Sequence, residues 1–125
     1  MKTSQDYLDE ANAVVRRISA KEAIEIHKGG EAVFVDVRDS KSLANTGTIE
    51  GAHHIARGMI ELSADRASPY HRDVLDPSKQ ICLVCGGGLM AAMAGKTLQE
   101  MGFQNVVNIG GIQEWKDAGG PTEEV

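Results

Sequence analysis

The sequence is poor in cysteine, proline and aromatic residues. Its 125 residues include two Cys, three Pro, one Trp, two Tyr and two Phe. Two cysteines are too few for the disulfide framework of a small secreted domain, so we predict a reducing, cytoplasmic location. With so few rings, the core must be mostly aliphatic. Hydrophobic residues make up 42% of the chain and charged residues 25%, a balance typical of one folded globular domain.

Basic charge is also in deficit. Thirteen Lys and Arg stand against 18 Asp and Glu, which gives a net charge of -5. This balance argues against a protein that binds nucleic acid or an anionic membrane surface. The first ten residues are polar and acidic, unlike a signal peptide. The longest uncharged stretch, residues 80–95, is shorter than the roughly 20 residues of a membrane-spanning helix.

Predicted helices and strands alternate along the chain. Apolar periodicity and capping residues predict helices at residues 4–17, 19–27, 39–46, 58–65, 89–101 and 110–118. Short apolar runs predict strands at residues 32–35, 53–55, 81–84 and 105–109. This alternation is typical of an α/β fold with a mainly parallel sheet, whose sites lie beyond the carboxyl ends of the strands. Asp36 and Arg38 follow one such strand, and Cys85 follows the next long one.

Cys85 lies where a predicted strand passes into a predicted helix, and Gly86, Gly87 and Gly88 form the turn between them. Glycines let the backbone curl tightly, so that successive amides can point inward and form an anion-binding nest. The positive end of the helix dipole adds to this effect and favours a thiolate, the reactive form of cysteine. The alternative interpretation is a buried cysteine beside a flexible turn.

Three other interpretations of this region fit the residues less well. A Cys-x-x-Cys redox pair would join Cys82 to Cys85, but three extended residues span about 10 Å, more than the roughly 7 Å that a disulfide allows between Cα atoms. We therefore predict that Cys82 is a core residue. A phosphate-binding loop ending at Gly95-Lys96-Thr97 would need a glycine where Met90 stands. A cysteine phosphatase of the pattern Cys-x5-Arg would need an arginine where Ala91 stands.

The histidines do not form a convincing metal site. His53 and His54 are adjacent in a predicted strand, so their side chains point to opposite faces of the sheet. His71 lies in a polar connection, and no second cluster supplies the missing ligands. We predict no metal.

The sequence resembles the rhodanese-like family over nearly its whole length. The resemblance rests on the order and spacing of five segments: Val33–Arg38, Gly47–Ile55, Ile81–Cys85, Ala94–Phe103 and Val106–Lys116. It implies a three-layer α/β domain with a central, mostly parallel five-stranded sheet and helices on both faces. We assign this domain to residues 18–125 and treat residues 1–17 as an N-terminal helical extension.

The resemblance also implies sulfur transfer without a cofactor. Cys85 would attack a donor such as thiosulfate or a persulfide and become a persulfide itself. The sulfur would then pass to a thiophilic acceptor, such as cyanide or a thiol, and either partner could be a protein. The substrate-binding residues would be those whose amides cradle the terminal sulfur: Gly86, Gly87, Gly88, Leu89 and Met90. This is covalent catalysis in two steps.

One departure from the family matters for the donor. Catalytic members usually carry a basic residue in this loop, most often an arginine at the position of Met90. We therefore expect thiosulfate to be a poor donor, and an inactive sulfur-binding or protein-interaction module is the alternative function. Arg57 would be the best remaining cation for an anionic donor, or else a solvated arginine. Asp36 and Arg38 are expected to fix the shape of the Cys85 loop without touching the substrate. Asp36 would either accept hydrogen bonds from loop amides or pair with Arg38.

Overall fold

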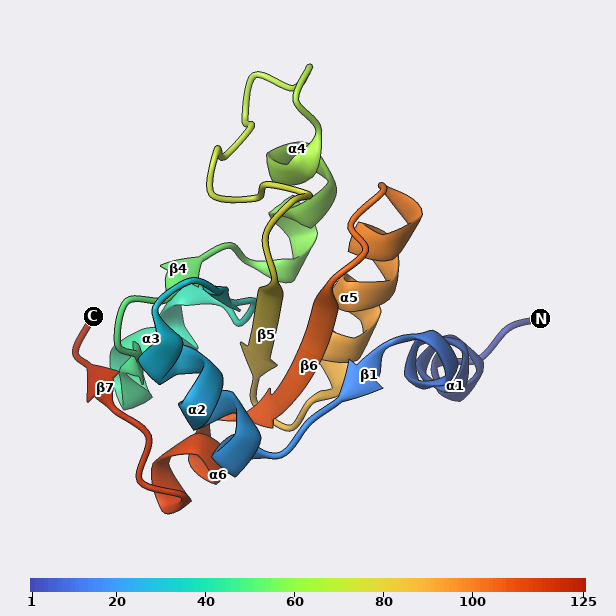
Figure 1. Cartoon of the computed structure of the whole chain (residues 1–125). Coiled ribbons are helices and arrows are strands. Elements are labelled where there is room, and N and C mark those ends of the chain that lie inside the picture. The colour runs from blue at the N-terminus through green and yellow to red at the C-terminus, as the bar shows by residue number, and fades with distance from the viewer.

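Five parallel strands form the central sheet of the protein. In the computed structural model, which describes residues 1–125, the order across the sheet is β1-β6-β5-β2-β4, and every neighbouring pair is parallel (Figure 1). The strands are β1 (Arg16–Arg17), β2 (Val33–Asp36), β4 (His53–His54), β5 (Ile81–Cys85) and β6 (Val106–Gly111). The predicted α/β fold with a five-stranded parallel sheet is thus confirmed.

Helices cover both faces of this sheet. The helices are α1 (Ser4–Val14), α2 (Ala20–Gly29), α3 (Ser40–Thr46), α4 (Ile60–Ala64), α5 (Leu89–Glu100) and α6 (Ile112–Asp117), with the 3-10 helix η1 (Arg57–Met59) before α4. Residues of α4 and α5 share one buried apolar cluster with one face of the strands. Residues of α2 and α6 share a second cluster with the other face. The sheet therefore separates two cores, as a three-layer domain requires.

The first helix is shorter than predicted, because the chain becomes extended at Val15. The expectation of a helix through residue 17 is wrong at its end. Arg16 and Arg17 instead pair with Val107 and Asn108 of β6 and form the edge strand of the sheet. The division of the chain between residues 17 and 18 stays a prediction, but two of the first seventeen residues lie in the central sheet.

The other predicted elements are present with small shifts of their ends. The strand predicted at residues 105–109 continues to Gly111, so α6 begins at Ile112. An additional two-stranded antiparallel sheet joins β3 (Thr48–Ile49) to β7 (Thr122–Glu123). The apolar pattern did not reveal it, because each of its strands has only two residues. None of the helices is both long and apolar enough to cross a bilayer.

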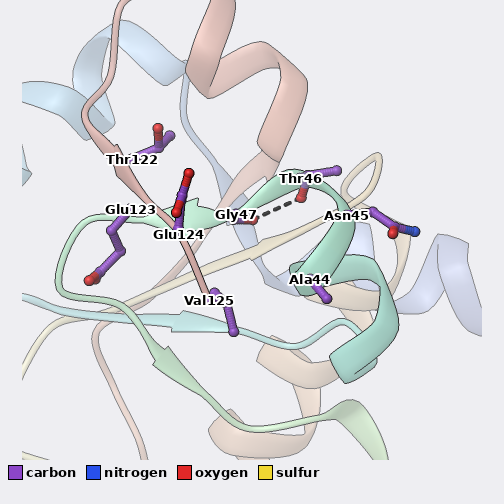
Figure 2. Close-up of a pocket in the computed structure, with 8 residues that line it drawn as sticks. All are labelled: Ala44, Asn45, Thr46, Gly47, Thr122, Glu123, Glu124 and Val125. Carbon is purple, nitrogen blue, oxygen red and sulfur yellow. Dashed lines mark hydrogen bonds between the residues drawn. The ribbon is translucent and has the colours of Figure 1, made fainter.

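The C-terminal segment and the end of α3 enclose a pocket of about 320 Å³ (Figure 2). It is lined by the residues drawn in the figure: Ala44, Asn45, Thr46, Gly47, Thr122, Glu123, Glu124 and Val125. Six of these eight residues are not hydrophobic, and none belongs to the loop that follows Cys85. The candidate site described next is therefore not defined by this pocket.

Candidate active site

Cys85 is the last residue of β5, and its sulfur is enclosed by the loop that leads into α5. Its residue is 2% exposed. Two backbone amides donate to Sγ: that of Gly88, at 3.0 Å, and that of Ala91, at 3.4 Å. The turn closes at Gly88, whose φ of 93° favours glycine. Of the amides predicted to surround the sulfur, those of residues 86–90, only that of Gly88 donates to Sγ, and Ala91 is a donor that the sequence did not suggest; anion binding by this turn stays a prediction.

Cys82 lies on the opposite face of the sheet. Its side chain belongs to the core cluster of α2 and α6, whereas Cys85 belongs to the cluster of α4 and α5. Both thiols are free. Burial raises the pKa of the Cys82 thiol to about 12, because the low-dielectric interior disfavours a thiolate. The prediction that Cys82 is a core residue is confirmed.

A glycine of β6, Gly111, allows the Cys85 loop to lie directly against this strand. Gly111 pairs with Cys85 in the sheet. A Cβ placed on Gly111 would lie 2.9 Å from the carbonyl carbon of Gly86 and 3.3 Å from Cα of Gly87. Gly110 has a φ of 85°, the left-handed region in which side chains are strained. The loop can lie this close to β6 because Gly111 has no side chain, whereas a Cβ on Gly110 would meet Glu114 and Arg17 instead.

The side chain of Asn108, in β6, forms hydrogen bonds that hold the Cys85 loop against this strand. The residue is 1% exposed, and its Nδ2 donates to the carbonyl of Gly88 at 2.9 Å. Its Oδ1 accepts from the amide of Gly110 at 2.8 Å. One buried amide side chain therefore joins both backbone segments that surround Cys85. The sequence analysis missed Asn108. A polar residue in the middle of an apolar strand could have indicated this role, because buried polar groups are nearly always hydrogen-bonded.

Arg17, at the edge of the sheet, also contacts the loop. Its Nη1 donates to the carbonyl of Gly87 at 3.4 Å, and its Nη2 donates to Oε1 of Glu114 at 2.9 Å. The same Glu114 oxygen accepts from the amide of Gly111 at 3.0 Å. Sequence reasoning missed Arg17 because it assigned this residue to the first helix.

Arg57 lies away from the Cys85 loop. Its guanidinium donates to Oγ1 of Thr97 at 3.0 Å and to Oε1 of Glu61 at 2.9 Å. Thr97 is eight residues beyond Leu89, the first residue of α5, which corresponds to about 12 Å along the helix axis. The structure thus holds Arg57 against the middle of α5, and a role in donor binding stays a prediction.

The first turn of α5 carries the two remaining residues predicted to bind substrate. Leu89 is 55% exposed and Met90 is 38% exposed. No acidic residue lies in this turn. The surface next to the Cys85 loop is therefore apolar on the side of α5, and the participation of these residues in binding stays a prediction.

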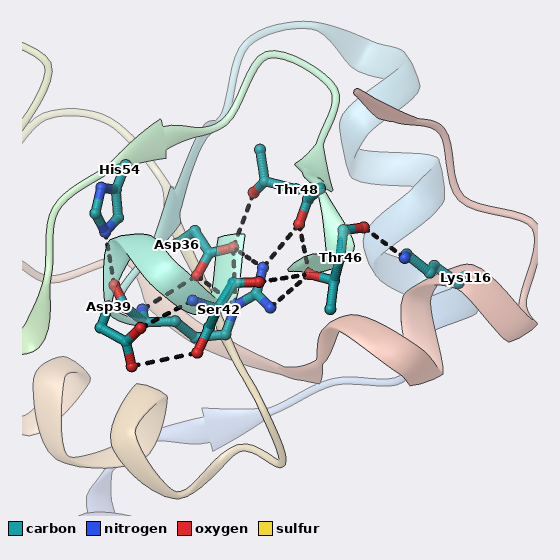
Figure 3. Close-up of polar contacts among 9 residues, drawn as sticks. Asp36, Asp39, Ser42, Thr46, Thr48, His54 and Lys116 are labelled. Carbon is teal, nitrogen blue, oxygen red and sulfur yellow. Dashed lines mark hydrogen bonds and ion pairs between the residues drawn. The ribbon is translucent and has the colours of Figure 1, made fainter. Parts of the chain in front are cut away.

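Asp36 and Arg38 form a buried ion pair. Figure 3 shows the polar contacts around Asp36. Arg38 Nη2 lies 2.7 Å from Asp36 Oδ2, and its Nε lies 3.0 Å from Oδ1. Thr48 Oγ1 also donates to Asp36, at 2.8 Å, while Arg38 donates to Thr46 Oγ1 and to the carbonyl of Gly47. Of the two expected arrangements, the pairing of Asp36 with Arg38 is present, but no hydrogen bond joins either side chain to the Cys85 loop, and support of the site by this pair stays a prediction. The pair braces the turn from α3 to β3, because Thr46, Gly47 and Thr48 belong to that turn.

The Asp36 carboxylate is separated from Cys85 by the sheet. Val35 and Val37 pack in the same cluster as Cys85, and side chains alternate along a strand. Asp36 therefore points to the other face, where it pairs in register with Val84. An anion at that place does not oppose a thiolate on Cys85 directly.

Two further contacts hold the region around this ion pair (Figure 3). His54 Nε2 lies 2.6 Å from the carbonyl of Arg38, and Lys116 Nζ donates to the carbonyl of Thr46 at 2.6 Å. The His54 Nε2 is thus hydrogen-bonded to a backbone carbonyl. The structure contains no group of three or more His, Cys, Asp or Glu side chains arranged to hold a metal ion.

Comparisons with known proteins agree with this geometry. The sequence profile of the rhodanese-like domain matches residues 19–118, so the chain belongs to the rhodanese-like family. It is therefore a member of a sulfur-transfer family. A search of curated proteins finds no match.

Solved structures include similar proteins with different descriptions. A Rhodopseudomonas palustris protein of unknown function, described as a possible tyrosine phosphatase, is 39% identical with a TM-score of 0.93, over 98% of this chain and 96% of that one. A polysulfide-sulfur transferase homodimer from Wolinella succinogenes is 30% identical with a TM-score of 0.75, over 94% of this chain and 85% of that one. A human single-domain sulfurtransferase, 24% identical over 82% of this chain and 96% of that one, has a TM-score of 0.70 and shares the fold.

Proposed function

We propose that this protein is a sulfurtransferase that carries sulfane sulfur on Cys85. The observation that supports this proposal is the enclosure of Sγ by the amides of Gly88 and Ala91. Hydrogen bonds from backbone amides favour the charged form of a thiol over the neutral form. No acidic side chain of the first turn of α5 opposes that effect. The arrangement suits a nucleophile that needs no neighbouring base.

The reaction has two displacement steps. In the first step, the Cys85 thiolate attacks the outer sulfur of a donor R–S–SH. The donor's S–S bond breaks, the thiolate RS⁻ leaves with the bonding electrons, and Cys85 becomes a persulfide. In the second step, an acceptor thiolate attacks the terminal sulfur, and the Cys85 thiolate is released. No net oxidant or reductant is needed, because sulfur moves between two thiols.

The donor is best sought among persulfides and polysulfides. The loop from Cys85 to Ala91 contains no basic side chain, and Arg57 is bound to Glu61 and Thr97. A hydrogen bond to a charged group is worth about 1.5–3 kcal/mol, so a missing cation costs a thiosulfate site roughly ten- to hundredfold in rate. The similarity to a polysulfide-sulfur transferase fits this choice. Cytoplasmic thiols or cyanide would serve as acceptors.

A phosphatase is the second candidate, because one similar protein is described as a possible tyrosine phosphatase. Phosphoryl transfer requires cationic groups that stabilise the charge on the phosphoryl oxygens. In this chain Ala91 occupies the position at which a Cys-x5-Arg loop has its arginine. The residues of the loop therefore favour sulfur transfer. An inactive sulfur-binding or interaction module is the remaining alternative.

Intact-mass measurement tests the proposal. The protein is incubated separately with polysulfide and with thiosulfate and is then weighed. We expect a gain of one sulfur atom with polysulfide and a much smaller fraction of adduct with thiosulfate. The adduct should disappear in Cys85→Ser and persist in Cys82→Ala, the matched control. Failure to form an adduct with either donor would contradict sulfur transfer, and hydrolysis of a phosphate ester that depends on Cys85 would favour the phosphatase.

A further inference from the structure

One peptide group of the Cys85 loop makes contacts on both of its sides. The amide of Gly88 donates to Cys85 Sγ at 3.0 Å. The carbonyl of Gly87 belongs to the same peptide group, and it accepts from Arg17 Nη1 at 3.4 Å. A guanidinium, a peptide dipole and the sulfur thus follow one another in a line of hydrogen bonds. Such chains polarise their members, so that a cation on the carbonyl side strengthens donation on the amide side.

Arg17 is held in this position by its surroundings. Its backbone is fixed by pairing of β1 with β6, and its guanidinium is held by Glu114 Oε1 at 2.9 Å. The space for the guanidinium exists because the loop has a glycine there. A Cβ on Gly88 would lie 2.9 Å from Arg17 Cζ and 3.2 Å from Nη2. The contact between Arg17 and the carbonyl of Gly87 thus joins residues that are 70 positions apart in the sequence.

We propose that Arg17 is a positioning residue that supplies, through the Gly87–Gly88 peptide, the positive charge that the Cys85 loop lacks. This inference rests on the proposed function, because it concerns how Cys85 becomes a nucleophile. Arg17 touches neither the sulfur nor a donor in this arrangement. It orients the Gly88 amide toward Sγ and stabilises negative charge on that sulfur, first in the thiolate and later in the persulfide.

The other charged groups around Cys85 leave Arg17 as the cation that contacts the loop. On α6, Glu114 binds Arg17 and reduces its net effect. On η1 and α4, Arg57 and Glu61 pair with each other beside Thr97. On β2, Asp36 is paired with Arg38 on the other face of the sheet. The first turn of α5 has no acidic residue and contributes the positive end of its dipole.

Arg16 provides a matched control within the same strand. Neighbouring residues of a strand point to opposite faces. Arg16 is 72% exposed at its side chain and reaches only Glu22, at 3.9 Å. Arg16→Met therefore removes the same charge from the same strand without touching the loop. Arg17→Met keeps an apolar stem of similar length, and Arg17→Lys restores a charge with a different shape.

The experiment measures alkylation of Cys85 by iodoacetamide across pH 5–10, with the modified peptide identified by mass. Only the thiolate reacts, so the rate reports the charge state of Sγ and needs no sulfur donor. We expect Arg17→Met to lower the rate at neutral pH by roughly three- to tenfold. The rate at the alkaline plateau should stay unchanged. Arg17→Lys should recover part of the loss, and Arg16→Met should match the wild type.

The outcomes separate the inference from the proposed function. A variant whose loop has merely loosened would react faster at every pH, since Cys85 is 2% exposed in the folded chain. That result, or profiles of Arg17→Met and Arg16→Met that coincide, would overturn the role of Arg17. In those cases persulfide formation with polysulfide would still show sulfur transfer. Conversely, an alkylation profile that depends on Arg17 without any persulfide would support the charge relay and refute the sulfurtransferase.

Discussion

Replacement of Gly111 by alanine tests whether β6 shapes the Cys85 loop. The backbone of Gly111 has a φ of -100° and a ψ of 157°, so alanine adopts it without strain. The effect must then come from contact. The new Cβ would lie 2.9 Å from the carbonyl carbon of Gly86, and nearer still to its oxygen. Carbon atoms pack at roughly 3.5 Å, so Gly86 must move by about 0.6 Å or more, together with the peptides that follow it.

Such a displacement affects the two amides that donate to Sγ. The Gly88 amide lies 3.0 Å from Sγ and the Ala91 amide 3.4 Å, so a shift of this size changes the length and the direction of both contacts. Because misplacement of reacting groups by about 1 Å costs on the order of a hundredfold in rate, we expect persulfide formation to fall roughly ten- to hundredfold. Overpacking of this kind also costs about 1–3 kcal/mol of stability.

The assay is the rate of the Cys85 mass adduct with polysulfide, and urea unfolding measures the stability of the same samples. Gly29→Ala is the matched control, since no atom lies within 4 Å of a Cβ at that position and its φ is not in the left-handed region. It should leave the rate unchanged. If the folded Gly111→Ala variant forms the persulfide at the wild-type rate, the close contact between Gly111 and Gly86 is not needed for the reactivity of Cys85.

Three further results are expected. Met90→Arg should raise the rate with thiosulfate roughly tenfold or more, by adding a charged hydrogen bond, and an unchanged rate measured by intact mass would show that charge is not what the loop lacks. Asp36→Asn should lower the free energy of unfolding in urea by about 3 kcal/mol, because buried Arg38 loses its charged partner. Sulfur loading of the folded variant should stay near that of the wild type. A decrease in the free energy of unfolding below about 1 kcal/mol would contradict this account. Cys82 has a pKa of about 12 in the folded chain and an ordinary thiol pKa when unfolded. Its protonated form therefore stabilises the fold fully below about pH 8.5, and this contribution is lost as the pH rises toward 12; Cys82→Ala should remove that part of the alkaline loss in a pH series of unfolding midpoints.

The sequence predicted the fold and the place of Cys85 because both depend on local signals. An apolar run, three glycines and a helical pattern follow one another at Cys85, and no long-range information is needed to place the turn. The resemblance to the rhodanese-like family supplied the number of strands. The same local reasoning found the pairing of Asp36 with Arg38, which lie two residues apart.

The residues that hold the loop from outside could not be found in this way. Arg17 extends a helical pattern in the sequence, and only its pairing with β6 makes it a strand residue. Asn108 contacts Gly88, 20 positions earlier, and Gly111 lies against Gly86, 25 positions earlier; both contacts exist only after β5 and β6 are adjacent. Arg57 was expected near the donor only from the resemblance to the family; its guanidinium contacts Glu61 and Thr97, and its role in donor binding stays a prediction. Local sequence patterns therefore predict where the candidate nucleophile lies, whereas the residues that hold its loop can be identified only from the tertiary structure.

The two cysteines lie on opposite faces of the central sheet, and this has a consequence for any sulfur bound to Cys85. A persulfide beside a second accessible thiol discharges within the same chain, by forming a disulfide and releasing sulfide. Here the sheet stands between the two sulfurs, so that internal route is closed. Each chain would therefore hold a single sulfur atom until a visiting thiol removes it, and the lifetime of the loaded form would be set by that encounter rather than by the protein itself.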